Sequence, residues 1–127
     1  MKITVIDYLP HGTATIKHED REAVFNTVLL DTGSAGCVFS VDVLREAGIE
    51  PPPEALIRRI VGIGGEEFIV DVLVDNLSIG TLQANGFTIE AGNLDYGFNF
   101  EAIIGFDFLQ QTGAVIDLAA MEIRGDG

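Results

Sequence analysis

The chain has 127 residues, a length that fits one domain, residues 1–127, and leaves no room for a second core of ordinary size. Apolar residues make up 47% of it, which is enough material for a buried core and argues against a disordered chain. With 7 Lys and Arg against 20 Asp and Glu, the formal charge is −13; such a field repels nucleic-acid phosphates and anionic lipid headgroups, so we expect no nucleic acid and no membrane as a partner.

Short apolar segments alternate with turn residues, and the 15 glycines fall mostly between those segments. This rhythm is typical of a β-rich domain, so we expect an all-β fold. Residues 3–6 predict a first strand, and residues 13–17 and 22–30 predict a hairpin whose polar tip is formed by residues 18–21. Further strands are predicted at residues 67–74, 77–79, 86–90, 102–104, 114–118 and 121–123.

Two short helices are predicted among these strands. Ser40 can cap a helix over residues 41–47, and Asp107 can cap one over residues 108–112; a glycine follows each helix. Each helix comes after an apolar strand and a turn that contains glycine. This weak internal repeat indicates a duplicated half-domain.

Cysteine and histidine are scarce. Cys37 is the one cysteine, which excludes an intrachain disulfide and a cysteine zinc site and favours a reducing compartment. His11 and His18 lack a plausible set of nearby ligands, so metal catalysis is disfavoured. The N-terminal residues contain no apolar segment of a signal peptide, and no stretch approaches a membrane span. We therefore expect a cytoplasmic protein.

A carboxylate stands directly after an apolar strand in Leu29-Leu30-Asp31-Thr32-Gly33. An acid at such a place is costly unless it is hydrogen-bonded, paired or shares a proton. Gly33 removes a side chain where another backbone or a substrate would approach, and the Thr32 hydroxyl can fix the loop. Taken alone, the segment could also be an ordinary turn that closes a hairpin.

A glycine-rich tip, Gly62-Ile63-Gly64-Gly65, lies between two β-like segments. A phosphate-binding loop is excluded, because no Lys-Ser/Thr pair follows and two glutamates would repel an anion. A mobile hairpin is the better interpretation, with a plain turn as its alternative.

In this order the segments resemble the retropepsin-like aspartic protease family. The resemblance covers about Thr13 to Ile123 and rests on the Asp-Thr-Gly loop, the glycine-rich hairpin, residues 102–109 and a closing segment at residues 115–118. It implies a closed β-barrel or sandwich with one or two short helices, active as a C2 homodimer. It also implies a peptide or protein substrate and no metal or cofactor.

The resemblance assigns roles to the loop and the tip. Asp31 would be the catalytic carboxylate, Thr32 would tie the two active-site loops together across the dimer, and Gly33 would let backbone and substrate approach. The substrate would also meet a flap tip, formed by Gly62, Ile63, Gly64 and Gly65.

Three further expectations concern the support of that loop. Ile104-Gly105 would pack beneath it. Asp107 is interpreted as a helix cap rather than a second catalytic acid. Cys37 and Phe39, which follow the loop, are most simply core residues.

Ser34 and the two residues after it depart from the retroviral pattern. Retroviral members usually carry Ala at the position of Ser34 and then acids that hold the substrate backbone, whereas Ala35-Gly36 follow here. Ser34 is instead similar to the Asp-Thr-Gly-Ser of pepsin-like relatives. We therefore assign Ser34 to substrate binding and expect its hydroxyl to donate to Asp31, which would favour an acidic activity optimum.

With one Asp-Thr-Gly, the catalytic pair must be Asp31 of two chains on a two-fold axis. Close like charges make such a pair share a proton, so one carboxylate activates water and the other polarises the peptide carbonyl. The expected activity is that of an aspartic-type endopeptidase. The competing hypotheses are a catalytically silent dimer of the same fold that binds peptide or partner proteins, and an unrelated β-sandwich interaction domain.

Overall fold

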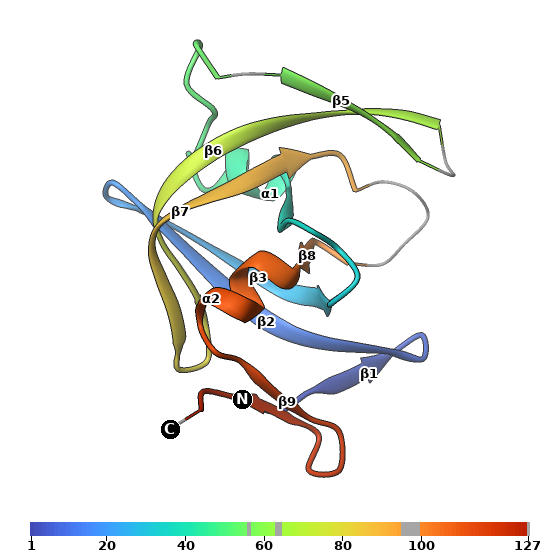
Figure 1. Ribbon diagram of the computed structural model, residues 1–127. Helices are drawn as coiled ribbons and strands as arrows, with labels where there is room; N and C mark the ends of the chain where they lie inside the picture. The colour runs from blue at the N-terminus through green and yellow to red at the C-terminus, as the bar shows by residue number, and fades with distance from the viewer. Residues whose placement is uncertain (56, 63–64, 95–99, 127) are drawn as a thin grey trace.

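The computed structural model describes residues 1–55, 57–62, 65–94 and 100–126, and Figure 1 shows curved strands with two short helices. The strands are β1 (Thr4–Ile6), β2 (Leu9–His18), β3 (Arg21–Leu30), β4 (Val38–Ser40), β5 (Ile57–Gly62), β6 (Gly65–Ile79), β7 (Leu82–Gly92), β8 (Ala102–Ile104), β9 (Val115–Asp117) and β10 (Glu122–Arg124). The helices are α1 (Val41–Glu46) and α2 (Phe106–Gln111). The prediction of an all-β fold with two short helices is confirmed.

Six of the strands close into a barrel. Their order is β2-β3-β8-β4-β7-β6, and β6 returns to β2 through antiparallel pairing of residues 76–78 with residues 15–17. β1 lies outside on β2, and β5 lies outside on β6. The interior holds aromatic pairs: Phe25 packs edge-to-face on Phe39 with ring centroids 4.8 Å apart, and Phe87 packs on Phe108 at 5.7 Å.

The predicted N-terminal hairpin is confirmed, because β2 and β3 pair antiparallel around Glu19 and Asp20. Two strands predicted separately, at residues 67–74 and 77–79, belong to the single 15-residue strand β6. The polar residues between them are typical of a turn in the sequence. In the structure the Asn76 Nδ2 donates to Asn85 Oδ1 of β7 at 2.8 Å, so the side chain strengthens the pairing where a break was expected.

α1 begins as predicted, since the Ser40 hydroxyl accepts from the Val43 N–H at 3.4 Å. α2 begins earlier than predicted, and its N-cap is Gly105. Asp107 lies in the first turn, where its carboxylate accepts from the adjacent Phe108 N–H at 2.7 Å. The predicted capping role of Asp107 is therefore wrong, because β8 passes through Gly105 directly into the helix.

The two halves of the weak internal repeat lie side by side. β3 and β8 pair in parallel, with Leu29 opposite Ile103 and Leu30 opposite Ile104. Both strands consequently end at the same end of the barrel. Asp31 follows one of them and α2 follows the other, so the parallel pairing brings the start of α2 to the loop of Asp31.

The two chain ends are joined by backbone hydrogen bonds. The Met1 ammonium donates to the Ile123 carbonyl at 2.9 Å, and the Ile123 N–H donates to the Met1 carbonyl at 2.9 Å. β10 thus lies between the N-terminal residues and β9, at the bottom of Figure 1. Within the described ranges, no helix has the length and apolar character needed to cross a bilayer.

Candidate active site

Asp31 lies directly after β3, in the loop that leads to β4. Its N–H donates to the Ile104 carbonyl at 2.9 Å, so the pairing of β3 with β8 continues as far as Asp31. The Gly33 N–H donates to Asp31 Oδ1 at 2.9 Å, and the Ser34 N–H donates to the Asp31 carbonyl at 3.2 Å. The loop therefore orients its own carboxylate, which is half-buried, while Thr32 and Gly33 are exposed in the single chain.

Gly105 supports this loop from the side of α2. A Cβ built on Gly105 would overlap the Gly36 carbonyl oxygen and lie 2.7 Å from the Ser34 carbonyl oxygen. The next residue, Phe106, donates its N–H to the Ser34 carbonyl at 2.7 Å. The predicted packing of Ile104-Gly105 beneath the loop is confirmed, and it depends on the absence of a side chain at position 105.

The Ser34 hydroxyl is used differently from the expectation. Its Oγ donates to the Gly36 carbonyl at 2.8 Å. A hydroxyl carries one proton, so this bond excludes a simultaneous donation to Asp31. The expected bond to Asp31 is wrong in the single chain, because the turn from Ser34 to Gly36 presents a carbonyl acceptor two residues away.

Cys37 and Asp107 form a side-chain contact between the loop and α2. The Cys37 Sγ donates to Asp107 Oδ1 at 3.2 Å and accepts from the Gly105 N–H at 3.3 Å. Burial is the main cause that raises the pKa of the Cys37 thiol far above its ordinary value, and the charge of Asp107 adds to the effect. The thiol is therefore protonated at neutral pH. As predicted, Cys37 and Phe39 are buried core residues.

A row of half-buried side chains crosses the barrel beside this loop. Residues that pair directly in neighbouring strands point to the same side of a sheet. The register pairs Leu29 with Ile103, Ile103 with Val38, Val38 with Glu90, and Glu90 with Asp71. The residues before and after each of them, apart from Val70, belong to the buried core. We call this row the outer row; its apolar members lie nearest to Asp31 in the strand order and its two acids lie farthest.

Gly62 and Gly65, the first and last residues of the segment predicted as a flap tip, lie at the ends of two antiparallel strands. β5 and β6 pair from Ile57 opposite Val70 to Gly62 opposite Gly65. Ile63 and Gly64 lie outside the described residues. In Figure 1 the hairpin extends from the top of the barrel, on the same side of the view as the loop between β3 and β4.

An ion-pair cluster that sequence reasoning missed joins this hairpin to the barrel. Arg58 of β5 contacts Asp71 of β6 at 2.7 Å and Glu90 of β7 at 3.3 Å. The Glu90 carboxylate also lies against the loop of Asp31, because a Cβ built on Gly36 would be 2.5 Å from Glu90 Oε1. Only the register of three strands brings these residues together, so no local motif signals the cluster.

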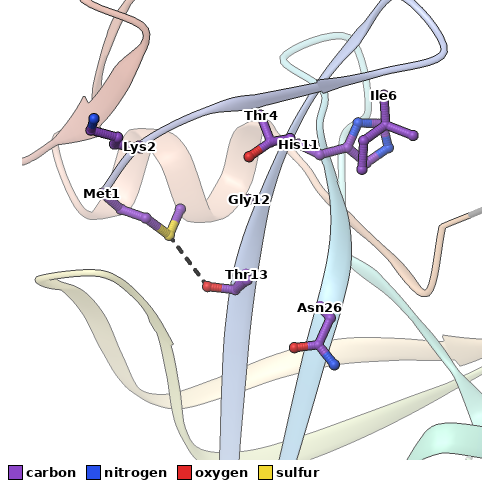
Figure 2. A pocket seen from close by; sticks show the side chains of 8 residues that line it. All are labelled: Met1, Lys2, Thr4, Ile6, His11, Gly12, Thr13 and Asn26. Carbon is purple, nitrogen blue, oxygen red and sulfur yellow. Dashed lines mark hydrogen bonds between the residues drawn. The ribbon is translucent and has the colours of Figure 1, made fainter.

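Among the pockets on the surface of the described residues, two have volumes of about 260 Å³ each. The first adjoins the loop of Asp31 and is lined by Thr32, Phe106, Leu109, Gln110, Ala114 and Ile116. The second is drawn in Figure 2 and is lined by Met1, Lys2, Thr4, Ile6, His11, Gly12, Thr13 and Asn26. The second contains none of the predicted site residues, so the predicted site does not extend to it.

Within residues 1–55, 57–62, 65–94 and 100–126, no group of three His, Cys, Asp or Glu side chains could hold a metal ion.

Comparison with protein families gives a match to the family model described as aspartyl protease, over residues 14–108. This range includes the loop of Asp31, the glycine-rich hairpin, β8 and the first turn of α2. No curated protein matches the chain in sequence. The closed barrel with two short helices is consistent with the retropepsin-like type of this family. The chain therefore belongs to the aspartyl protease family.

Proposed function

We propose that the chain is an aspartic endopeptidase whose catalytic pair consists of Asp31 from two identical chains. The observation that supports this most directly is the fixed position of Asp31. Gly33 orients its carboxylate, and β8 holds its backbone through the Ile104 carbonyl. The sequence contains one Asp-Thr-Gly, so a second carboxylate of this kind has to come from a second chain.

Two such carboxylates in contact share one proton, because both cannot ionise side by side. The ionised Asp31 takes a proton from water, whose oxygen attacks the carbonyl carbon of the scissile peptide bond. The protonated Asp31 donates its proton to the carbonyl oxygen, which gives a tetrahedral diol. Collapse of the diol breaks the C–N bond while the carboxyl group that took the proton from water gives it to the leaving amine and the ionised carboxylate takes a proton from a diol hydroxyl.

The surface beside Asp31 supports a homodimer. Phe106, which is 50% exposed, lines the apolar pocket with Thr32 and Ile116, and Leu118, two residues after Ile116, is 64% exposed. Large side chains of this kind lose contact with water when a second copy covers them. β9 pairs on one edge only among the described strands, so its other edge can pair with a copy of itself.

The substrate in this proposal is an extended peptide on the apolar part of the outer row, Leu29, Ile103 and Val38. Thr32 ties the two loops across the axis, Gly33 leaves room for the substrate backbone, and Ser34 borders the peptide. The tip of the hairpin, Gly62, Ile63, Gly64 and Gly65, closes over it.

A catalytically silent dimer that binds peptide or partner proteins is the alternative. Such a module has no use for two carboxylates in contact, which cost free energy when they are desolvated. The retained Asp31, with its hydrogen bond from Gly33, favours the enzyme.

Replacement Asp31→Asn tests the proposal. The amide keeps the shape and can accept from the Gly33 N–H, but it cannot transfer the proton, so cleavage of an unstructured protein should fall by about 10²- to 10⁴-fold. The matched control is Asp20→Asn, which removes an exposed acid at the tip between β2 and β3 and should leave cleavage unchanged. Cleavage that persists in pure Asp31→Asn protein would exclude Asp31 as the catalytic group.

A further inference from the structure

We propose that Glu90 is a positioning residue that holds the flap hairpin, residues 57–62 and 65–70, against the loop of Asp31 by means of Arg58. The proposal deepens the proposed function, because it names the contact that sets the distance between the flap and the catalytic loop. It rests on the proposed function only for the hairpin's role in catalysis; the contact itself can be tested without activity.

The reach of Arg58 across the sheet is the first argument. β5 pairs with β6 and with no other described strand, so its backbone hydrogen bonds reach the barrel only through β6. Arg58 pairs with Ile69, and Asp71 lies two residues farther along β6 on the same side. Glu90 is opposite Asp71 in β7. The contact with Asp71 therefore stays inside the hairpin, whereas the contact with Glu90 spans from β5 to β7.

The second argument is the anchoring of Glu90 on the catalytic loop. The Glu90 N–H donates to the Cys37 carbonyl at 2.8 Å. Its carboxylate lies in the space that a side chain at Gly36 would occupy. Cys37 is itself bonded through its thiol to Asp107 of α2. Arg58 thus meets a carboxylate whose position is fixed by the residues that follow Asp31.

The charges around Glu90 decide what this carboxylate contributes. Arg58 faces it from β5, Asp71 faces it from β6, and Asp107 acts on it from α2. Burial, the largest effect, raises the pKa of Glu90; Arg58 lowers it, and Asp71 and Asp107 raise it, with a net pKa above the ordinary value. An acid with a raised pKa in the folded state stabilises the fold below its unfolded pKa and loses that contribution as the pH rises. At neutral pH the charge of Glu90 therefore supplies the contact with Arg58 and no net stability.

Glu90→Gln and Asp71→Asn form a matched pair for the test. Each removes one carboxylate from Arg58, but only Glu90 connects Arg58 to the catalytic loop. We would measure amide hydrogen exchange at residues 69–72 and 89–92, which join the hairpin to β7. Glu90→Gln should speed exchange there about two- to fivefold, in line with a partly exposed ion pair, and Asp71→Asn should leave it unchanged.

A purely structural role for Glu90 predicts that Glu90→Gln lowers the free energy of unfolding. If Glu90 positions the hairpin, the urea midpoint of Glu90→Gln at neutral pH stays equal to or above that of the unsubstituted protein, although exchange is faster. A lower midpoint, or equal exchange in all three proteins, overturns the proposal. Adding Glu90→Gln to Arg58→Met should change the exchange no further; additive effects would mean that Glu90 acts without Arg58.

Acidification and kinetics complete the test. After correction for the intrinsic pH dependence of amide exchange, lowering the pH through the raised pKa of Glu90 should reduce the protection of these amides in the unsubstituted protein and leave their protection in Glu90→Gln unchanged. For a peptide substrate, Glu90→Gln should raise KM about two- to fivefold with kcat nearly constant, and Asp71→Asn should not. If the unsubstituted protein cleaves no peptide, the proposed function is wrong, and the exchange data still test the contact of Arg58 with Glu90. If it cleaves peptide and the exchange is the same in all variants, only the positioning role is wrong.

Discussion

Gly105 shows how the active-site loop depends on a missing side chain. The Gly36 and Ser34 carbonyl oxygens approach the position where a Cβ would stand, and the Gly105 N–H donates to Cys37 Sγ. The loop of Asp31 can therefore pack on the start of α2 only if residue 105 is glycine, and its backbone is extended rather than left-handed.

Gly105→Ala should lower the free energy of unfolding by about 1–3 kcal/mol, because the new methyl group forces the backbone of residues 34–36 to move. Gly125→Ala is the matched control, since a Cβ there would meet Leu82 Cδ2 at an ordinary 3.6 Å. Urea unfolding of both variants gives the comparison. Equal stability of the two variants would show that the loop can move away at no cost.

The hairpin of β9 and β10 depends on an acid near the surface. Asp117 Oδ1 accepts from the Ala120 N–H at 2.9 Å, and Arg124 lies 3.2 Å from Oδ2. The backbone bond from Ala120, followed by the bond from Arg124, lowers the pKa of Asp117 below its ordinary value. A lowered pKa contributes stability above the unfolded pKa, and this contribution is lost as the pH falls through the folded value.

Asp117→Asn should therefore lower Tm at neutral pH, and the difference from the unsubstituted protein should disappear in strong acid. Thermal unfolding at pH 7 and at a pH below the folded pKa provides the measurement. A difference that persists in acid would mean that shape, and not charge, accounts for the role of Asp117.

Association of two chains determines whether the molecule as a whole has a complete site. Phe106 is an exposed apolar side chain in the pocket that Thr32 also lines, and the charge of −13 on each chain opposes the approach of two chains. Salt screens such repulsion beyond about 10 Å at 0.1 M, so apolar contact can prevail at physiological ionic strength.

Phe106→Glu should abolish dimerisation and cleavage together while the chain stays folded, because it places a further charge in the apolar surface. Val24→Glu is the matched control, since Val24 is 48% exposed on β3 and lies away from that surface. Sedimentation at several concentrations gives the dimer fraction, and specific activity should fall with it on dilution. Full activity in a verified monomer would contradict the shared site.

The all-β class, the hairpin of β2 and β3, and the place of Asp31 directly after an apolar strand are predictable from the sequence alone. These features depend on the alternation of side chains along one strand and on turn residues at its ends, which are local properties. The packing of Ile104-Gly105 beneath the loop was also predicted, because the resemblance joined two segments that no local pattern connects.

Packing in three dimensions sets the acceptor of the Ser34 hydroxyl, the start of α2 at Gly105, and the contact of Arg58 with Glu90. The hydroxyl could reach more than one acceptor, and the choice depends on how the turn to Gly36 folds. The meeting of Arg58 with Glu90 depends on the register of β5, β6 and β7. A shift of one residue in either pairing would turn one partner to the opposite face of the sheet, and register is set by the packing of the whole barrel.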